Sequence, residues 1–344
     1  QCGNIDTGSP VFNLPRFASA GGGAHRTSAN GRDRRRPASR AALNPLGADL
    51  NATIVGAFGR HYEVAVEDGS VAACFPRGKR SVYACGDRVR VALTAPDQGV
   101  IEELVERRTL LFRRDEWREK LIAANGTQVL IVVATEPSFS DELVSRCIAA
   151  AENQEMKAAI VLNKVDLDAP LPGSRASLEP FRRLGYPVIE LCARRDASAL
   201  RETLSGETTV FVGQSGMGKS TLINALIPGA NATTREHSRV LDSGKHTTTH
   251  TRLYQLDCNS ALIDSPGMQV FGLTQLTIGT LEQAFIELRP MLGQCRFRDC
   301  RHETEPGCAV IDAVARGEID ARRIAHYHVL QREIVAAGAT RFAI

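Results

Sequence analysis

Long apolar stretches are missing from this sequence, and no run approaches the roughly 18 residues that would cross a membrane. The first residues also lack the charged and then apolar pattern of a secretory signal. Aromatic residues make up only 5% of the chain, and its nine cysteines are too few and too scattered for a disulfide scaffold. These absences predict a cytoplasmic protein in a reducing compartment, with no membrane partner.

Excess charge of one sign is also missing, because the formal net charge of the 344 residues is only +3. The distribution is uneven, since residues 1–48 contain seven arginines against two aspartates, a balance of +5. This segment is poor in large apolar residues, which predicts a disordered tail that buries too little surface to offset chain entropy. Two interpretations fit it, a solubilising tail and an arm for RNA phosphates.

Residues 49–110 contain short runs of β-favouring residues, at 52–56, 62–66 and 88–93, separated by turn signals. Strands of this length and spacing predict a small all-β barrel. A basic barrel surface is expected from Arg60, His61, Arg77, Lys79, Arg80, Arg88 and Arg90, with interleaved aromatic residues at positions 58, 62, 75 and 83. Basic and aromatic residues on a small barrel suit nucleic acid, although an aromatic residue is more often part of the core.

From residue 111 to 275, buried-strand patterns alternate with helical patterns, which predicts an α/β domain with a mainly parallel sheet. Strands are expected at 129–133, 159–162, 187–191, 209–212 and 261–263, and Asp141 is expected to cap a helix. Ligands of open parallel sheets bind at the carboxyl ends of the strands. Loops at those ends are therefore the candidates for a site.

The strand expected at 209–212 leads into Gly213-Gln214-Ser215-Gly216-Met217-Gly218-Lys219-Ser220, then Thr221 and a helical pattern. A strand, a glycine-rich turn and a helix in this order are typical of a phosphate-binding P-loop. The glycines let successive N–H groups surround an anion, which the first turn of the helix also attracts. Lys219 is expected to reach the β and γ oxygens of a nucleoside triphosphate, and Ser220 to ligate Mg²⁺.

Asn163-Lys164-Val165-Asp166 follows the strand expected at 159–162. A rigidly held carboxylate at Asp166 accepts two N–H donors from guanine, whereas adenine would leave this buried charge unpaired. The stem of Lys164 is expected to cover the base, and Asn163 to tie this loop to the P-loop. The pattern predicts guanine nucleotides and disfavours an ATP-using kinase or ATPase.

Asp264-Ser265-Pro266-Gly267 follows the last expected strand and predicts the loop beside the metal ion. Asp264 is expected to reach Mg²⁺ through water, and the Gly267 N–H to meet the γ-phosphate. Thr248, within a run of three threonines, is expected to complete the Mg²⁺ shell. Met268 is apolar and orients no water, so slow intrinsic hydrolysis is expected.

Cys295, Cys300, His302 and Cys308 have the spacing C-x₄-C-x-H-x₅-C. Three thiolates and one imidazole form the closed, tetrahedral ligand set of structural zinc. With helical patterns on both sides, residues 276–344 are expected to form an α-helical zinc-binding domain. The last helix carries Arg322, Arg323, His326, His328 and Arg332, which indicate either a solvated face or an RNA contact.

The order of the loops, from 163–166 through 192–193, 213–220 and 247–249 to 264–267, resembles that of the circularly permuted GTPases. Ordinary GTPases place the P-loop first. With the barrel before them and the cysteine cluster after them, residues 50–335 resemble the ribosome small subunit-dependent GTPase A family. The resemblance implies an OB-fold barrel, Cys192 and Ala193 beside the guanine, and His246 as the residue that positions water.

The same resemblance implies a monomeric GTPase that hydrolyses GTP to GDP and phosphate. Its implied partners are the small (30S) ribosomal subunit and 16S rRNA, with late maturation as its role and hydrolysis stimulated by the subunit. An RNA-binding assembly chaperone, for which GTP is an ordering ligand and hydrolysis is incidental, is the alternative.

Overall fold

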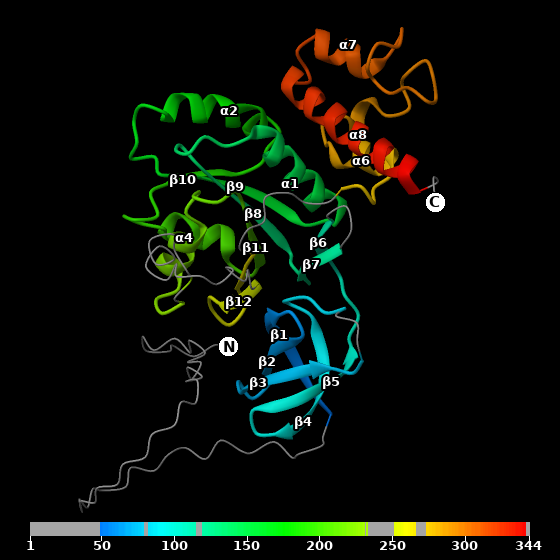
Figure 1. The fold of residues 1–344 in the computed structure, drawn as a ribbon. Helices are drawn as coiled ribbons and strands as arrows, with labels where there is room; N and C mark the ends of the chain where they lie inside the picture. Colours follow the sequence, from blue (N-terminus) through cyan, green and yellow to red (C-terminus); the bar gives the residue numbers. More distant parts are fainter. Residues whose placement is uncertain are drawn as a thin grey trace, which may run out of the picture.

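The computed structural model describes residues 49–78, 82–114, 119–230, 232, 251–265 and 273–341. Figure 1 shows a small barrel below a central α/β domain, with a helical C-terminal domain above it on the side of α1. No helix within these described ranges is long and apolar enough to span a membrane. The expected tail, residues 1–48, lies outside them.

The barrel consists of β1 (Asp49–Phe58), β2 (His61–Val66), β3 (Val71–Pro76), β4 (Arg88–Ala95) and β5 (Gln98–Leu104). The strands pair in the order β1-β2-β3-β5-β4, and β4 pairs back with β1, which closes the barrel. Along β2, buried residues alternate with more exposed ones, so Tyr62, Val64 and Val66 fill the core with Ile54 of β1. The predicted small barrel is confirmed.

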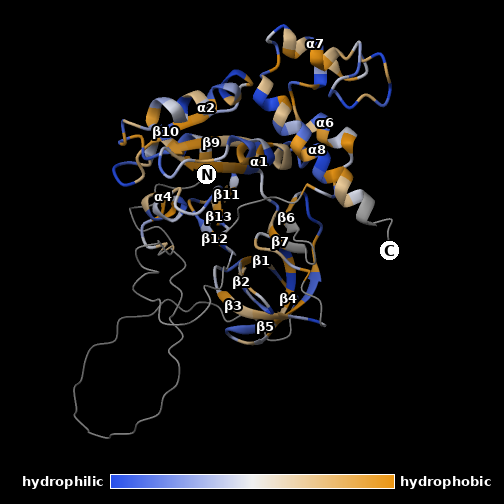
Figure 2. Cartoon of the chain, turned by 45° about the horizontal axis from the view of Figure 1, so that its top comes forward, coloured by the Kyte–Doolittle hydropathy of each residue, from blue (hydrophilic) through white to orange (hydrophobic). Residues whose placement is uncertain are grey.

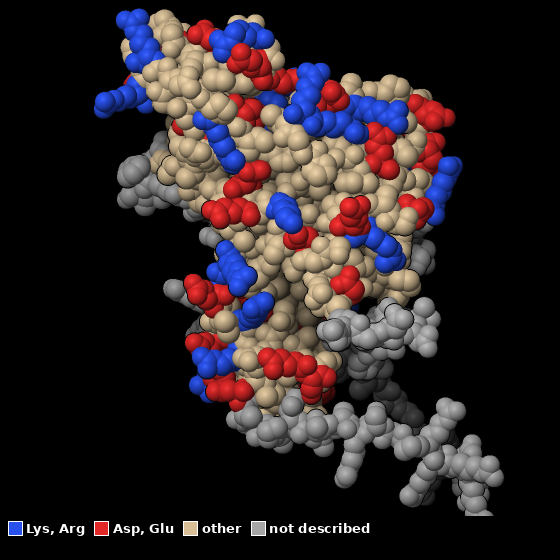
Figure 3. All heavy atoms as spheres, turned by 180° about the vertical axis from the view of Figure 1, so that it is seen from behind, with Lys and Arg blue, Asp and Glu red and all other residues tan. Residues whose placement is uncertain are grey.

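Three arginines of this barrel segment are paired with carboxylates. Arg77 Nε lies 2.9 Å from Glu102 Oε2, Arg90 pairs with Glu103, and Arg107 Nε lies 2.6 Å from Asp87 Oδ1. Figure 3 shows Lys and Arg interspersed with Asp and Glu over one face of the molecule. Residues 49–110 contain eight Lys and Arg against nine Asp and Glu, so the expectation of a basic barrel was wrong.

Between barrel and sheet lies an antiparallel hairpin of β6 (Leu110–Arg114) and β7 (Glu119–Ala124), which forms a separate two-stranded sheet. The expected alternation of strands and helices therefore starts only at β8, later than residue 111. Both hairpin strands are short and pair with each other, so they are not part of the parallel sheet.

The α/β domain has a six-stranded sheet in the order β10-β9-β8-β11-β13-β12, parallel except for β12. All seven residues of β8 are buried, as expected for a central parallel strand, and the sheet strands are among the most hydrophobic segments in Figure 2. The elements in chain order are β8 (Gln128–Ala134), α1 (Asp141–Asn153), β9 (Lys157–Asn163), α2 (Leu171–Arg183), β10 (Val188–Leu191), η1 (Ser198–Leu200), α3 (Arg201–Leu204), β11 (Thr208–Val212), α4 (Lys219–Leu226), β12 (Thr251–Gln255) and β13 (Ala261–Asp264).

The five strands expected in this domain are all present, but one helix start differs. Asp141 is the first residue of α1, and the cap is Ser140, whose hydroxyl accepts from the Leu143 N–H at 3.3 Å. A serine in extended conformation suits this position, while Asp141 still favours the positive end of the helix dipole.

The barrel and the α/β sheet share one continuous sheet. β12 pairs antiparallel with β1, with Gly56 opposite Arg252 and Ala57 opposite Thr251. Strand β1 therefore contributes to the barrel and extends the α/β sheet at the same time.

The C-terminal domain contains α6 (Ile278–Ala284), η2 (Arg289–Met291), α7 (Ala309–Ala315) and α8 (Ala321–Arg341). Helix α1 packs against α6 and α8, and residues such as Phe285 and Tyr327 share one hydrophobic core with it. The helical domain is thus packed on the α/β domain.

Of the five basic residues expected to mark α8, three belong neither to a solvated face nor to a free RNA surface, whereas Arg322 and Arg332 are exposed. Arg323 is only 1% exposed, and its guanidinium lies 5.2 Å from the Phe181 ring and 4.5 Å from the Phe285 ring. His326 Nδ1 lies 2.8 Å from Ser145 Oγ of α1, and His328 Nε2 lies 2.9 Å from the His302 carbonyl oxygen. Both expectations were wrong for these three residues, because packing against other elements uses their polar groups.

Candidate nucleotide site and metal cluster

The glycine-rich turn lies between β11 and α4, at the centre of the sheet. Gly213 and Gly218 both have positive φ, of 142° and 97°. A Cβ on Gly213 would lie 2.1 Å from the Val132 carbonyl oxygen, and one on Gly218 would lie 2.2 Å from Asn163 Nδ2. Only glycine fits these positions, because the neighbouring strand ends approach the loop so closely.

The Lys219 ammonium is folded back over this turn. Its Nζ donates to the carbonyl oxygens of Gly213 at 2.6 Å and Gln214 at 3.0 Å. Burial lowers the pKa of Lys219, and the Asp264 carboxylate partly offsets this effect. The side chain is 9% exposed, so a cation is held inside the loop where an anion would enter.

Asp264 ends β13 next to the same turn. It is 7% exposed, and burial raises the pKa of its carboxyl to about 6 against the opposing effect of Lys219. Its Oδ1 is buried and has no hydrogen-bond partner in the part of the chain that the structure describes. A buried carboxylate oxygen with spare lone pairs fits an oxygen-preferring cation such as Mg²⁺, held directly or through water.

Asn163 joins the loops at three strand ends. Its Nδ2 donates to the Met217 carbonyl oxygen at 2.9 Å, and its Oδ1 accepts from the N–H groups of Lys164 at 2.8 Å and Ala193 at 3.0 Å. The expected tie between this loop and the P-loop is confirmed. The N–H of Ala193, a residue expected beside the guanine, donates to Asn163 in this structure.

Lys164 crosses from its own loop to the P-loop. Its Nζ donates to the carbonyl oxygen of Gly216 in the P-loop at 2.9 Å and to that of Glu136, in the loop after β8, at 2.6 Å. The aliphatic stem of Lys164 therefore extends from its own loop to these two loops. Thr135, which the sequence pattern did not single out, donates from Oγ1 to the Lys164 carbonyl oxygen at 2.8 Å. The position of Thr135 just after the buried strand β8 was the signal in the sequence that could have identified it.

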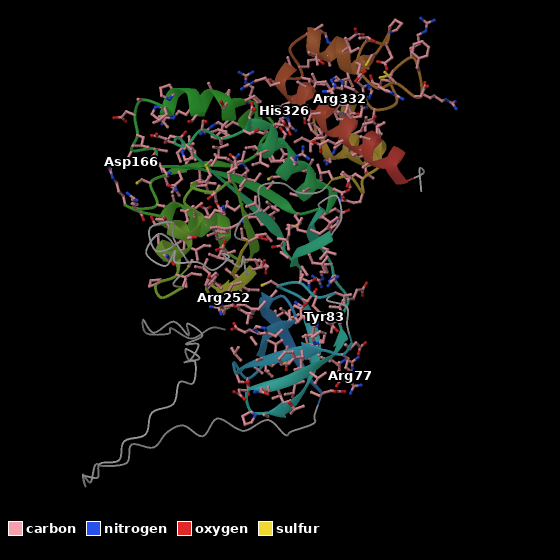
Figure 4. All side chains as sticks on the ribbon, viewed as in Figure 1. Arg77, Tyr83, Asp166, Arg252, His326 and Arg332 are labelled. Atoms are coloured by element: carbon pink, nitrogen blue, oxygen red, sulfur yellow. The ribbon has the colours of Figure 1, made fainter. Side chains whose placement is uncertain are left out.

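Asp166 differs from the prediction in its burial. The sequence predicts a buried carboxylate, whereas Asp166 is exposed at the edge of the α/β domain (Figure 4). A hydrogen bond from the Cys192 thiol lowers the pKa of this carboxyl, and its own N–H, Arg195 and Arg194 act in the same direction. The carboxylate is therefore charged, and among the described residues it is accessible to a ligand.

Three further candidates, His246, Thr248 and Gly267, lie outside the described residues. The described candidates of the nucleotide site lie at the carboxyl ends of four parallel strands, with β8 between β9 and β11. They are Asn163 at the end of β9 and Lys164 and Asp166 after it, Cys192 and Ala193 after β10, the turn from Gly213 to Ser220 and Thr221 after β11, and Asp264 at the end of β13.

Comparisons with known proteins match this geometry. The model of the RsgA GTPase family matches residues 104–274. The small ribosomal subunit biogenesis GTPase RsgA of Burkholderia pseudomallei strain K96243 is 53% identical over 304 residues, which cover 87% of this chain and 96% of that protein. The chain belongs to the RsgA GTPase family.

Two solved structures extend the family likeness to the fold. YjeQ from Thermotoga maritima has a TM-score of 0.65 and 29% identity, covering 84% of this chain and 99% of that one. YloQ, described as a circularly permuted GTPase, has a TM-score of 0.63 and 27% identity, covering 87% and 98%. This RsgA-family chain is thus a circularly permuted GTPase, as its loop order predicts, and it hydrolyses GTP.

The second site of this RsgA-family GTPase is the cysteine cluster. The ligand atoms of Cys295, Cys300, His302 and Cys308 all lie within 4.8 Å of one another. Cys295 Sγ is 3.8 Å from Cys308 Sγ, and His302 Nδ1 is 3.3 Å from Cys308 Sγ. Two sulfurs bound at about 2.3 Å to a tetrahedral zinc ion would be about 3.8 Å apart, so the cluster can hold one metal ion.

The far side of the His302 ring contacts a carboxylate that the sequence pattern did not reveal. His302 Nε2 lies 3.4 Å from Glu282 Oε1, and the Tyr327 hydroxyl donates to the same oxygen at 3.3 Å. Such a carboxylate fixes the tautomer of a metal-binding histidine, leaving Nδ1 for the metal. Glu282 lies on α6, 20 positions before His302, so only the folded chain brings them together.

Proposed function

We propose that this chain is a GTPase of small ribosomal subunit assembly. In this proposal it binds the 30S subunit and its 16S rRNA late in maturation, and binding accelerates GTP hydrolysis. The relatives named small ribosomal subunit biogenesis GTPase RsgA support the assembly role. Release as GDP-bound protein would follow hydrolysis.

We assign the nucleotide site to the loops that Asn163 joins. GTP is held by the turn of residues 213–221, with Lys219 at the β and γ oxygens, while Asp166, Lys164, Cys192 and Ala193 surround the guanine. Bound Mg²⁺ would supply charge neutralisation between the phosphates. Ser220 and Thr248 would hold it, Asp264 through water, Gly267 would meet the γ-phosphate, and His246 would position the attacking water.

The observation that carries this assignment is the set of three hydrogen bonds made by Asn163. One buried amide fixes the guanine-side loops and the P-loop relative to one another, so the base and the phosphates are positioned as one ligand. The Lys219 ammonium donates to the carbonyl oxygens of Gly213 and Gln214. Phosphate oxygens would replace these acceptors.

The segments assigned to Mg²⁺ and to the γ-phosphate connect the site to the two flanking domains. The segment with Thr248 continues into β12, which pairs with β1 of the barrel. The segment after Asp264 continues to Leu273 and Leu276, which are buried in the core shared by α1 and the C-terminal helices. This connectivity supports a switch in which the γ-phosphate changes the positions of both flanking domains.

The metal ion of the cysteine cluster is zinc, since three thiolates and one imidazole suit a closed structural site. The protein is a cytoplasmic monomer with a basic tail (1–48), an OB-fold barrel (49–110), a permuted GTPase domain (111–275) and a zinc-binding helical domain (276–344).

The test is GTP hydrolysis measured with and without isolated small subunits, with Lys219→Ala as the inactive control. We expect faster turnover with subunits, and a non-hydrolysable GTP analogue should keep the protein bound to them. Unchanged turnover would contradict the proposal. Normal release with the analogue would instead favour the chaperone alternative, in which hydrolysis is incidental.

A further inference from the structure

We propose that the groove between the barrel and the turn after β12 binds one unpaired nucleotide of the small-subunit RNA. Arg88 would contact its phosphate, and the amides of Gln255 and Asn259 would contact the edge of its base. This inference rests on the proposed function, because it names a part of the RNA partner that the protein recognises. It places that contact at a site separate from the GTP site.

The groove opens where β1 leaves the α/β sheet and enters the barrel. Strand β1 pairs with β12 at Gly56 and Ala57, whereas its earlier residues, 49–53, pair with β4 of the barrel. Strands β1 and β12 therefore diverge, and a groove of about 600 Å³ lies between them. This volume is within the range of sites for small ligands.

This groove lies at the edge of the sheet opposite the nucleotide loops. Thr208 and Ala261, the first residues of β11 and β13, line it, and they are partners in the parallel ladder. The P-loop and Asp264 lie at the other ends of the same two strands. A ligand in the groove therefore does not compete with GTP for space.

Alternation along β1 determines which of its side chains form the barrel wall of the groove. Ala52 and Ile54 point into the barrel core, so Thr53 and Val55 point outward, and both line the groove. Val55 and Leu253 of β12 supply apolar surface to it. A flat nucleic-acid base that has left its stack packs well against apolar side chains.

The polar side chains of the groove are mainly neutral, and its charged ones are Glu67 and Arg88. Glu67 Oε1 already accepts a hydrogen bond from Asn51 Nδ2 at 3.2 Å. Arg88 is exposed and makes no ion pair with any residue that the structure describes, although three other arginines of the barrel segment do. Such an arginine suits a phosphate group, whose oxygens accept two of its N–H donors.

The turn after β12 presents amide groups to the groove. The Asn259 N–H donates to Asp257 Oδ1 at 2.8 Å, and the Leu256 N–H donates to the Ser260 carbonyl oxygen at 2.9 Å, so the backbone of the turn is fixed. Gln255 Nε2 donates to the carbonyl oxygens of Asp257 at 2.6 Å and Ser260 at 3.3 Å, which leaves its Oε1 as an acceptor. The exposed side chain of Asn259 offers both a donor and an acceptor. Amides of this kind match the hydrogen-bonding edges of bases.

This combination of groups favours a nucleotide over a peptide. A basic peptide would need several carboxylates and an acidic peptide several cations, whereas the groove has one of each, and Glu67 is already hydrogen-bonded. One phosphate, one base edge and one flat face together match Arg88, the amides and the apolar wall. Proteins read RNA sequence mainly from unpaired bases, so the ligand is an unpaired nucleotide.

The experiment measures Kd for short single-stranded RNAs, oligo(A), oligo(C) and oligo(U), with the full chain saturated with GDP and Mg²⁺. We expect Arg88→Met to weaken binding of all three RNAs about three- to tenfold and to reduce the dependence of log affinity on log salt by about 1. Asn259→Ala should leave the salt dependence unchanged and weaken binding of one RNA more than the others, because base contacts carry the sequence preference. Arg90→Met is the matched control, since Arg90 pairs with Glu103 and does not line the groove.

Cys258 provides a second measurement, because it lines the groove and is exposed. Bound RNA should slow alkylation of Cys258 in the parent protein, followed by mass spectrometry, and Asn259→Ala should reduce this protection. Equal alkylation rates of the parent with and without saturating RNA would overturn the inference.

Groove variants that bind RNA as the parent does would also overturn it, and the proposed function would stand if small subunits still accelerate GTP hydrolysis. Variants that lose affinity for small subunits but keep their affinity for RNA would indicate a ribosomal protein in the groove, against the inference. If small subunits do not accelerate hydrolysis by the parent protein, the proposed function fails, whereas the RNA measurements still decide what the groove binds.

Discussion

Arg252 Nη2 lies 2.7 Å from Glu63 Oε2, an ion pair that joins β12 to the barrel. Figure 4 labels Arg252 between the α/β domain and the barrel. The same guanidinium lies 5.9 Å from the centre of the Phe58 ring, which stacks on His61 with centroids 5.0 Å apart. One side chain thus contacts two barrel strands from the edge of the GTPase sheet.

Replacing Arg252 should therefore weaken the joint between the two domains. We expect Arg252→Met to lower the free energy of unfolding by about 1 kcal/mol, because the ion pair is partly shielded and leaves Glu63 without its partner. Denaturant unfolding measures this value. The control is Arg90→Met, whose pair with Glu103 is about half exposed, with side-chain exposures of 48% and 56%, and which should change stability by less than about 0.5 kcal/mol. Equal effects of the two substitutions would contradict a specific role for Arg252.

Asp264 should make the nucleotide-free protein sensitive to pH. Its pKa in the folded chain is about 6, raised by burial above its ordinary value of 3.8. A raised pKa means that the folded state binds the proton of Asp264 more tightly than the unfolded state does. Protonation of Asp264 therefore stabilises the folded state fully below about pH 4, and this stabilisation is lost as the pH rises through 6. The measurement is unfolding free energy between pH 4.5 and 7.5, without nucleotide or Mg²⁺.

Asp264→Asn removes this buried charge. We expect the nucleotide-free variant to be more stable than the parent at pH 7, by up to about 3 kcal/mol, with the difference disappearing near pH 4. GTP hydrolysis should fall by at least about tenfold to a hundredfold, as for other groups that orient a metal ion. A variant that is less stable at pH 7, or that keeps full activity, would count against the role of Asp264.

Removal of the bound metal ion should affect the C-terminal domain first. Metal analysis of the purified protein should find one zinc ion per chain, and Cys308→Ser should lose it, because the remaining ligands no longer close the tetrahedron. Affinity for GDP should change little, since the nucleotide loops are held by the parallel sheet. Retention of the ion by Cys308→Ser would contradict the assignment of this ligand.

Glu282→Gln tests the contact behind His302. We expect zinc affinity to fall about tenfold to a hundredfold, because the carboxylate no longer orients the imidazole. Competition with a metal chelator measures the affinity. Glu305→Gln is the control, since that side chain accepts from the backbone of residues 301, 303 and 304 and does not contact the His302 ring.

Arg323 should be one of the most sensitive positions for stability. Its Nε lies 2.7 Å from Glu287 Oε1, and the exposures of the two side chains are only 2% and 4%. Arg323→Met should destabilise the protein by about 3 kcal/mol or more, because it leaves a buried carboxylate without a partner. The double variant Arg323→Met with Glu287→Leu should recover most of this lost stability. If it does not, the loss comes from the packing of the side chains and not from the unpaired charge.

Local patterns were sufficient for much of the fold and of the site. The buried strand runs, the turn of residues 213–220 and the cysteine spacing each depend on residues close in sequence, whose periodicity or chemistry determines the local structure. The order of the loops then indicated a permuted GTPase, which the comparisons confirm.

Contacts between distant segments could not be predicted in this way. The burial of Arg323 depends on Phe181 of α2, more than a hundred positions earlier, and the partner of His302 lies on α6. The exposure of Asp166 and the occupied Ala193 N–H likewise depend on how neighbouring loops meet. No periodicity or spacing in the sequence predicts such contacts between distant segments.

The pairing of β1 with β12 has a consequence for any attempt to divide the molecule. A chain that began after the barrel would leave β12 as an open edge, with unsatisfied N–H and C=O groups along one side. Open edges recruit strands from other molecules, so the shortened GTPase is expected to aggregate. The barrel thus also acts as an edge cover, and a soluble active fragment would have to retain it.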